Sequence, residues 1–134
     1  MEFKIGITGQ SGFMGRHLSN FLRTKENILI IDFERSYFED YLKLEQFVSL
    51  CDVVVHIAAM NRHENQQFIY DTNIGLVEKL VNACEKTKST PKIIFSSSTQ
   101  EENDNLYGAS KKDGRKILDQ WANSTNGKVV SLVI

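Results

Sequence analysis

Two side chains that can move a proton stand four residues apart in the stretch YGASK, residues 107–111. Residues at this spacing on a helix share one face. A tyrosine hydroxyl has a reference pKa of about 10, which makes it a poor base at neutral pH, but a nearby ammonium favours the phenolate. The spacing therefore predicts an acid–base pair in which Tyr107 exchanges the proton and Lys111 assists it.

A run of hydroxyl side chains follows a short apolar stretch at residues 92–97. If that stretch is a strand of a parallel sheet, the run lies at the carboxyl edge, where open α/β sheets bind their ligands. A hydroxyl there can donate a hydrogen bond to a substrate carbonyl. We assign this role to Ser98, with Ser97 and Thr99 as alternatives. Ordinary loop chemistry at a strand end is the competing interpretation.

Three glycines punctuate the stretch TGQSGFMG, residues 8–15, between an apolar run and a helical pattern. Gly9 is expected to make the sharp turn, Gly12 to let a diphosphate approach the backbone, and Gly15 to allow close packing of the helix on the strand. A glycine triplet alone is a weak signal, but the strand–turn–helix context predicts dinucleotide binding at a helix N-terminus.

An acidic residue, Asp32, ends the next apolar run, seventeen positions after Gly15. A carboxylate there can accept hydrogen bonds from the adenosine ribose hydroxyls and would repel a 2′-phosphate, which favours NAD as the cofactor. Arg35 could instead pair with that phosphate, so NADP stays open. A simple capping role at the strand end is the remaining alternative for Asp32.

Strand-like and helix-like segments alternate along the whole chain. This alternation requires a parallel sheet covered on both faces, and it predicts a Rossmann-type, doubly wound, three-layer α/β/α fold for a single NAD(P)-binding domain over residues 1–134. The last strand coincides with the chain end, so we expect the N-terminal part of a longer enzyme, with the substrate lobe missing. The expected strands are 3–8, 27–32, 52–59, 92–97 and 128–134, and the expected helices are 13–24, 40–50, 65–88 and 107–123.

Composition argues against several other classes of protein. The formal net charge is -1 and the densest basic stretch, residues 111–116, is interrupted by an aspartate, so no nucleic-acid partner is expected. No apolar run approaches the roughly 20 residues that cross a bilayer. Cys51 and Cys84 fit neither a disulfide framework nor a zinc site. We therefore expect buried thiols in a reducing cytoplasm, no metal and no membrane association.

Taken together, these stretches resemble the extended short-chain dehydrogenase/reductases. That family includes the sugar-nucleotide epimerases, dehydratases and 4-keto reductases. The resemblance extends over essentially the whole chain, except that the family's C-terminal substrate lobe is absent. It is carried by TGQSGFMG (8–15), VVVHIAA (53–59), Asn73, FSSS (95–98) and YGASK (107–111).

The resemblance implies a role for each matching residue. Tyr107 would be the acid/base, Lys111 its partner, Ser98 the hydroxyl that orients the carbonyl, and Asn73 a helix residue that shapes the active site. Lys111 would also reach the nicotinamide ribose. The cofactor would contact Gly9, Ser11, Gly12, Phe13, Met14, Gly15, Asp32, Ala58, Ala59, Asn73 and Lys111.

A closer likeness is to the reductase half of the bifunctional capsular-polysaccharide enzyme of the CapF type. It rests on AAMNRHEN (58–65) and on the short gap of nine steps between Ser98 and Tyr107. In that type, the loop corresponding to Asn61, Arg62 and His63 borders the substrate; simple solvent exposure is the alternative. The chain departs from the type in having Leu106 where proline usually precedes the tyrosine, an acid at position 32, and no cupin sequence.

The function expected from these features is hydride transfer between a nicotinamide and a sugar carbon of a nucleotide-activated sugar. We place 4-keto reduction ahead of epimerisation or dehydration through a keto intermediate. The competing classes are a non-catalytic NAD(P)-binding sensor or regulatory module and an inert fragment. His56 is expected to be a core histidine, and Gly114 to mark a close helix–helix contact. A homodimer through the helices 65–88 and 107–123 is possible.

Overall fold

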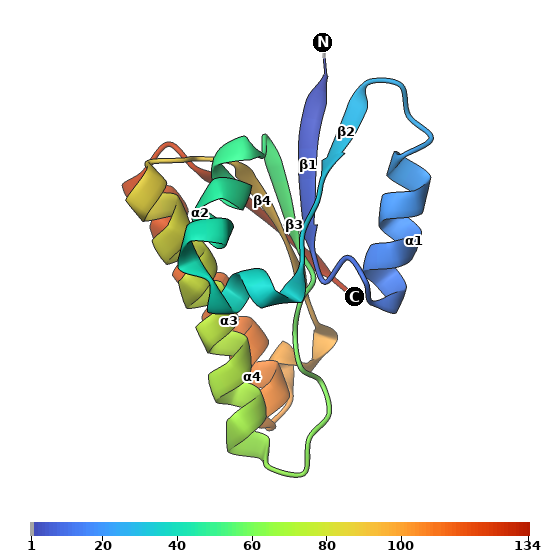
Figure 1. The fold of residues 1–134 in the computed structure, drawn as a ribbon. Coiled ribbons are helices and arrows are strands. Elements are labelled where there is room, and N and C mark those ends of the chain that lie inside the picture. The colour runs from blue at the N-terminus through green and yellow to red at the C-terminus, as the bar shows by residue number, and fades with distance from the viewer. Residues whose placement is uncertain (1) are drawn as a thin grey trace.

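The computed structural model describes residues 2–134 and contains one five-stranded sheet (Figure 1). All neighbouring strands are parallel, in the order β2-β1-β3-β4-β5. Short runs rich in β-branched residues build these strands, as expected for parallel strands that are covered by helices. The strands are β1 (Phe3–Thr8), β2 (Ile28–Ile31), β3 (Val53–His56), β4 (Lys92–Ser97) and β5 (Lys128–Val133).

Helices connect every strand to the next, and side-chain caps begin three of the four α-helices. Asp40, Asn65 and Asn105 each accept a hydrogen bond from a backbone N–H in the first turn of the helix that follows. The α-helices are α1 (Phe13–Leu22), α2 (Tyr41–Leu50), α3 (Gln66–Thr87) and α4 (Leu106–Ser124), and the 3-10 helices are η1 (Arg35–Glu39) and η2 (Thr99–Glu102).

The helices cover the two faces of the sheet unequally. Within residues 2–134, α1 lies on one face, next to β1 and β2, while α2, α3 and α4 lie on the other (Figure 1). The sheet is therefore wound in both directions from β1 and β3, which confirms the Rossmann-type α/β/α fold. Both α1 and α4 begin at the carboxyl edge of the sheet, because each follows directly or shortly after a strand that ends there.

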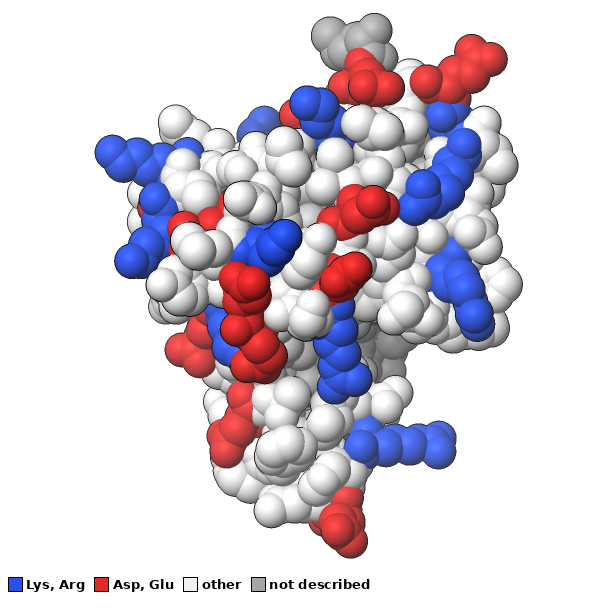
Figure 2. All heavy atoms as spheres, viewed as in Figure 1, with Lys and Arg blue, Asp and Glu red and all other residues white. Residues whose placement is uncertain are grey.

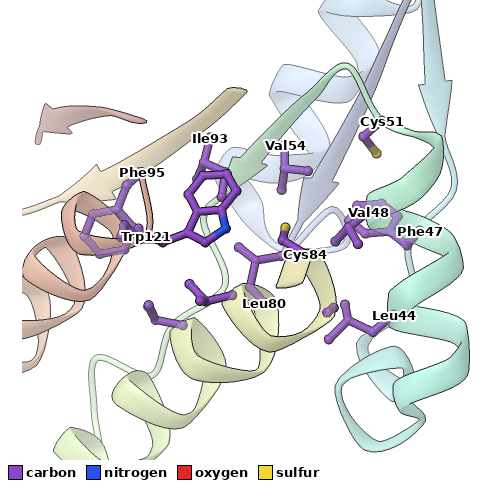
Figure 3. Close-up of a cluster of buried hydrophobic side chains, with 14 of the residues drawn as sticks. Leu44, Phe47, Val48, Cys51, Val54, Leu80, Cys84, Ile93, Phe95 and Trp121 are labelled. Carbon is purple, nitrogen blue, oxygen red and sulfur yellow. The ribbon is translucent and has the colours of Figure 1, made fainter. Parts of the chain in front are cut away.

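The core fills the space between the sheet and the three helices α2, α3 and α4 (Figure 3). Phe47 of α2, Leu80 of α3 and Leu118 of α4 are almost completely buried against Val54 and Ile93 of the sheet. Burial of such side chains contributes roughly 1.5–3 kcal/mol each before entropy is counted. This packing holds the helices that carry the candidate catalytic residues.

Three sequence expectations for the fold need correction. The strand expected to reach Ala59 ends at His56, because the next two backbone N–H groups donate to a side chain of β1 and leave the ladder. Both 3-10 helices were not expected. The helical spacing of residues 13–24 puts Phe21 on one face with Leu18 and Leu22, which would be an apolar face, yet Phe21 is 58% exposed and contacts the ammonium of Lys25.

Other expectations are confirmed. His56 is a core residue, and Gly114 lies where an added Cβ would come within 3.2 Å of Val77 on α3. Cys51 and Cys84 are buried thiols, and burial raises the pKa of each to about 12. On the face seen in Figure 2, cationic and anionic side chains are interspersed. None of the helices in residues 2–134 has the length and apolar character that crossing a membrane requires.

Candidate active site

The glycine loop joins β1 to α1 at the carboxyl edge of the sheet. Gly9 has φ of +75°, a conformation that favours glycine, and the N–H of Gly12 donates to its carbonyl across the turn at 3.0 Å. A Cβ at Gly15 would overlap that same carbonyl oxygen. The turn therefore requires glycine at position 9, as predicted, and glycine is required at position 15 by the close approach of α1 to the glycine loop itself.

The first turn of α1 is open toward this edge. Gly12 is the N-cap residue and provides no side-chain cap, and the first intrahelical bond runs from the N–H of Arg16 to the carbonyl of Gly12. The N–H groups of Phe13, Met14 and Gly15 thus precede the first bonded turn and are available to an acceptor. An uncapped helix start beside a glycine loop fits a phosphate group without further side chains.

A buried threonine joins the end of β1 to the segment after β3. The Thr8 hydroxyl oxygen accepts from the N–H groups of Ile57 at 3.1 Å and Ala58 at 3.2 Å, so its own proton goes to Nδ1 of His56, 2.7 Å away. Burial, with a contribution from Lys111, lowers the pKa of His56 to about 3, and the ring stays neutral. This contact places Ala58 beside the glycine loop, where the cofactor was expected.

Asn73 links the loop after β3 to the start of α4. Its side-chain oxygen accepts from the N–H of Met60 at 2.7 Å, and its amide donates to the Met60 carbonyl at 2.8 Å and to the Ser110 hydroxyl at 3.0 Å. Ser110 in turn donates to the carbonyl of Tyr107 at 2.7 Å. Asn73 is therefore placed to shape the site, by fixing the backbone on two sides of it.

Tyr107 and Lys111 lie on one face of the first turns of α4. Lys111 is only 4% exposed; its ammonium donates to the Ser96 carbonyl at 2.9 Å and lies 5.9 Å from the Tyr107 ring centroid. Burial lowers the pKa of Lys111 to about 8. The ammonium is thus largely charged at neutral pH, close to the phenol, and less strongly hydrated than one at the surface.

Ser98 follows β4 and begins η2 at the same edge. It is 8% exposed, and its hydroxyl oxygen accepts from the N–H of Gln100 at 3.1 Å. η2 packs directly on α4, because a Cβ at Gly108 would overlap the Gln100 carbonyl. From the sequence, no role was assigned to Gly108. Its position directly after Tyr107, at the start of a helical pattern, was the available signal for close packing there.

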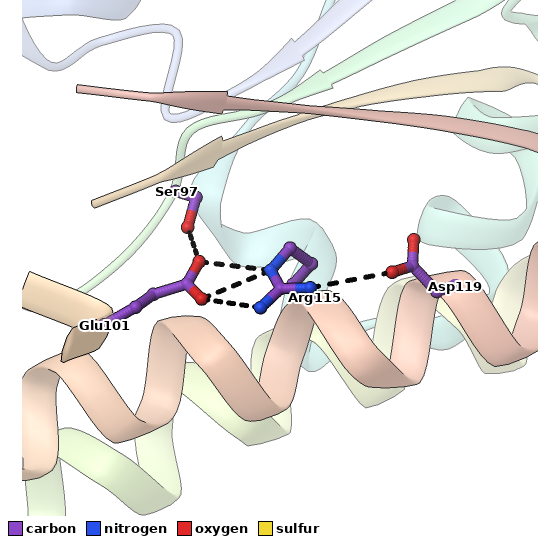
Figure 4. A network of polar contacts seen from close by, with 4 residues as sticks. All are labelled: Ser97, Glu101, Arg115 and Asp119. Carbon is purple, nitrogen blue, oxygen red and sulfur yellow. Dashed lines mark hydrogen bonds and ion pairs between the residues drawn. The ribbon is translucent and has the colours of Figure 1, made fainter. Parts of the chain in front are cut away.

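A polar network fixes η2 against the middle of α4 (Figure 4). The hydroxyl of Ser97 donates a hydrogen bond to the carboxylate of Glu101. The same carboxylate accepts bidentate hydrogen bonds from Nε and Nη2 of Arg115, the shortest at 2.7 Å. Arg115 lies 3.9 Å from Asp119, one turn further along the helix. The hydrogen bond from Arg115 holds the pKa of Glu101 below its usual range. Only the tertiary structure brings this network together.

We predict that Glu101→Gln lowers the free energy of unfolding by about 1.5–3 kcal/mol at neutral pH, the range for a hydrogen bond to a charged group. Because the folded-state pKa of Glu101 is lowered, the carboxylate stabilises the fold above its ordinary pKa, and this contribution is lost as the pH falls through the folded-state value. Denaturant titrations at neutral and acidic pH should therefore show the difference from the wild type shrinking in acid. Glu102→Gln, on the exposed neighbour, is the control; an equal effect there would contradict the role of the network.

The remaining predicted residues lie at the same edge but are largely open to solvent. Asp32 follows β2 with its side chain 88% exposed, 3.9 Å from the Arg23 guanidinium. Asn61, Arg62 and His63 lie in the loop that projects beyond the sheet between β3 and α3, together with the exposed Ala59 (Figure 1). The ring of His63 accepts from the N–H of Asn65 at 3.0 Å and so helps to form the start of α3.

Comparisons with known proteins identify similar chains. The chain is 31% identical over 118 residues to a UDP-2-acetamido-2,6-beta-L-arabino-hexul-4-ose reductase of Pseudomonas aeruginosa, covering 86% of this chain and 30% of that protein. It is 26% identical to the capsular polysaccharide assembling protein CapF of Staphylococcus aureus, with a TM-score of 0.75, covering 96% of this chain and 33% of that one.

The fold is also that of RMD from Pseudomonas aeruginosa, solved with NADPH, at a TM-score of 0.85 and 18% identity over 96% of this chain and 52% of that one. The chain thus spans a third to a half of the length of these solved structures. Residues 5–134 match the NAD dependent epimerase/dehydratase family throughout. Since this match includes both the glycine loop and the Tyr107 helix, the chain belongs to the NAD dependent epimerase/dehydratase family.

Proposed function

We propose that the chain binds NAD(P) along the carboxyl edge of its sheet and takes part in hydride transfer at a sugar carbon of a nucleotide-activated sugar. The observation that carries the proposal is the buried ammonium of Lys111, 5.9 Å from the ring centroid of Tyr107, at the edge where the glycine loop begins. A buried ammonium costs free energy, and groups with such perturbed pKa values are concentrated at functional sites.

The residues at the edge fit the cofactor from one end to the other. The open N–H groups of Phe13 and Met14 would hold the diphosphate, and Asp32 would accept from the adenosine ribose. Ala58 donates its backbone N–H to Thr8 of β1 and would contact the cofactor between the diphosphate and the nicotinamide ribose, which would lie at Lys111. When bound, the nicotinamide supplies or accepts the hydride.

The side chains on the nicotinamide side would handle the proton and the carbonyl oxygen. In the direction of reduction, Tyr107 donates a proton to the carbonyl oxygen, and Lys111 stabilises the phenolate that remains. Ser98 donates a hydrogen bond to the same oxygen and so orients it. Asn73 and Ser110 hold the backbone of Tyr107 in place while the proton moves.

A 4-keto group on a UDP-linked deoxysugar is the substrate that the comparisons support best. The similar Pseudomonas protein is named as a reductase of such a hexulose. Asn61, Arg62 and His63 would border the sugar, since their loop projects beyond the edge. Epimerisation or dehydration through a keto intermediate would use the same residues and is the second candidate. The reducing cytoplasm is the expected compartment.

Coenzyme titration followed by a turnover assay tests the proposal. Nicotinamide fluorescence should report saturable binding of NADH or NADPH, and a UDP-linked 4-keto-deoxysugar should cause oxidation of the bound coenzyme. Binding without turnover of keto or hydroxy sugars would favour a sensor module or an inert fragment. If neither coenzyme binds, both the enzyme and the sensor interpretation are wrong.

Asp32→Ala should shift coenzyme preference toward NADP. The carboxylate repels a 2′-phosphate and accepts hydrogen bonds from the ribose hydroxyls of NAD. Its removal should therefore strengthen NADPH binding and weaken NADH binding, and the ratio of the two dissociation constants should change by about 10-fold. The ratio of the two dissociation constants measures this. Glu34→Ala removes a neighbouring acid that makes no cap at η1 and is the matched control. An unchanged ratio would mean that Asp32 is not the selector.

A homodimer through the outer surfaces of α3 and α4 stays a prediction. The two helices already pack on each other, with Gly114 of α4 against Val77 of α3, so only their remaining surfaces are available to a second copy. Such a dimer would bury the surfaces of α3 and α4 that contact neither the sheet nor each other; these helices carry Asn73 and Tyr107. Light scattering of the purified protein at several concentrations would detect it.

A further inference from the structure

The segment around Ser98 is held on both sides by one residue, Glu101. Ser98 leads directly into η2, where its carbonyl accepts from the backbone N–H of Glu101 and its hydroxyl oxygen accepts from that of Gln100, each at 3.1 Å. The carboxylate of Glu101 then accepts from the hydroxyl of Ser97, the residue before Ser98. Glu101 is therefore bonded to the residues on either side of the hydroxyl that was assigned to the carbonyl oxygen, and to the backbone between them.

The same carboxylate contacts the helix that carries the other two candidate catalytic side chains. It accepts bidentate hydrogen bonds from Arg115 of α4 (Figure 4). Arg115 lies one turn beyond Lys111, which itself lies one turn beyond Tyr107. A bidentate pair fixes the angle between its partners as well as their distance. The pair of Glu101 with Arg115 therefore sets the position of η2 relative to the helix of Tyr107 and Lys111.

The pair is also better shielded from water than a surface ion pair. The side chain of Glu101 is 13% exposed and that of Arg115 is 34% exposed. Among the ion pairs found in residues 2–134, it is both the shortest and the least exposed. Exposed ion pairs constrain their partners weakly, because water and salt compete for both charges. A shielded bidentate pair is the kind that can hold a segment in one place.

The placement of η2 decides where the proton of the Ser98 hydroxyl can point. Within the described residues this hydroxyl accepts a hydrogen bond from Gln100 and donates none, so its proton is available to a substrate oxygen. Gln100 is fixed in turn at the start of α4, where its side-chain oxygen accepts from Asn105 at 3.2 Å and its carbonyl lies against Gly108. A shift of η2 would therefore move the donor that orients Ser98.

We propose that Glu101, held by Arg115, is a positioning residue that aims the Ser98 hydroxyl at the carbonyl oxygen of the substrate. The inference rests on the proposed function, in which Ser98 orients that oxygen. Glu101 contacts neither substrate nor coenzyme and acts only through Ser98. A misplacement of about 1 Å at a reacting group can cost about 100-fold in rate, so a residue that fixes the donor contributes to turnover without touching the substrate.

A double-mutant cycle on turnover tests this role, with a UDP-linked 4-keto-deoxysugar as substrate. Glu101→Gln should lower turnover about 10-fold and leave the dissociation constants of NADH and NADPH unchanged. Ser98→Ala should lower turnover about 100-fold, as expected for the loss of one donor to the reacting oxygen. Glu101→Gln added to Ser98→Ala should cause little further loss, because the hydroxyl that it positions is already gone.

Arg115 provides a graded variant at the other end of the pair. Arg115→Lys keeps the positive charge but cannot make the bidentate contact, so its turnover should fall between that of the wild type and that of Arg115→Met. If Glu101→Gln does not fold, Arg115→Lys alone and with Ser98→Ala repeats the cycle. Thermal melts of each variant define the temperature at which all are folded, and the rates are measured below it.

Two controls separate positioning from stability. Asp40→Ala removes the cap of α2, a helix that carries no candidate site residue, and should lower the melting temperature without lowering turnover. Glu102→Gln, on the exposed neighbour, should change neither. Full turnover in Glu101→Gln would overturn the inference, as would an equal loss with and without the Ser98 hydroxyl. A wild type that binds no coenzyme or reduces no keto sugar would instead overturn the proposed function, and the role of Glu101 with it.

Discussion

Tyr107→Phe should lower turnover by at least about 100-fold, the lower end for a positioned proton donor, while leaving coenzyme affinity nearly unchanged. The substitution removes one hydroxyl from a ring whose centroid lies 5.9 Å from the ammonium of Lys111. Fold and coenzyme site should persist, since the backbone of Tyr107 stays bonded through Ser110. Steady-state rates together with NADPH and NADH titrations measure both parts of this expectation.

A second tyrosine provides the matched control. Tyr70 of α3 donates to Asp113 of α4 at 2.6 Å, so Tyr70→Phe also removes a hydroxyl from the packed pair of helices, but one that is bonded to a carboxylate and not placed beside the Lys111 ammonium. It should alter stability slightly and turnover little. Near-normal turnover in Tyr107→Phe, or an equal loss in both variants, would remove Tyr107 from the chemistry.

Lys111→Met should also abolish most turnover, because the phenolate loses its nearby positive charge and the nicotinamide ribose loses a donor. An effect on turnover of about 100-fold or more is expected from removing the group that assists proton transfer. Coenzyme affinity should fall as well, which distinguishes this variant from Tyr107→Phe. Lys112→Met, which changes the exposed neighbour on the same helix, should leave both measurements unchanged.

The buried ammonium also predicts how activity and stability depend on pH. Since burial lowers the pKa of Lys111 to about 8, wild-type turnover should decline as the pH rises above that value. The free energy of unfolding should have the opposite trend. Between about 8 and 10.5 the unfolded chain holds a proton that the folded chain has lost, so this group makes the fold more stable as the pH rises.

Lys111→Met removes the free-energy cost of burying an ammonium. The variant should therefore resist denaturant at least as well as the wild type at neutral pH while being nearly inactive. Loss of activity without loss of stability would show that the lysine is kept for chemistry. A variant that unfolds, or one that keeps its alkaline decline in turnover, would contradict this account. Denaturant titrations and pH–rate profiles of the same preparations provide both readouts.

The sequence was sufficient to predict most of the fold. Strands and helices depend on patterns within short stretches of sequence. The continuous apolar run at 92–97 forms β4, and the helical pattern at 65–88 forms α3. The same holds for the glycine loop, whose geometry depends on residues within one turn. The failures arose where a distant group intervened, as when Thr8 of β1 drew Ile57 and Ala58 out of the predicted strand.

By itself, then, the sequence determined the alternation of strands and helices, the glycine turn, and the spacing that puts Tyr107 and Lys111 on one face of α4, because each depends on near neighbours. Only the tertiary structure decided which of these elements meet. The order β2-β1-β3-β4-β5 brings Thr8 to His56, and the packing of α3 on α4 brings Asn73 to Ser110 and Tyr70 to Asp113. Those contacts join segments far apart in the chain, and burial and packing, which no local pattern records, select them.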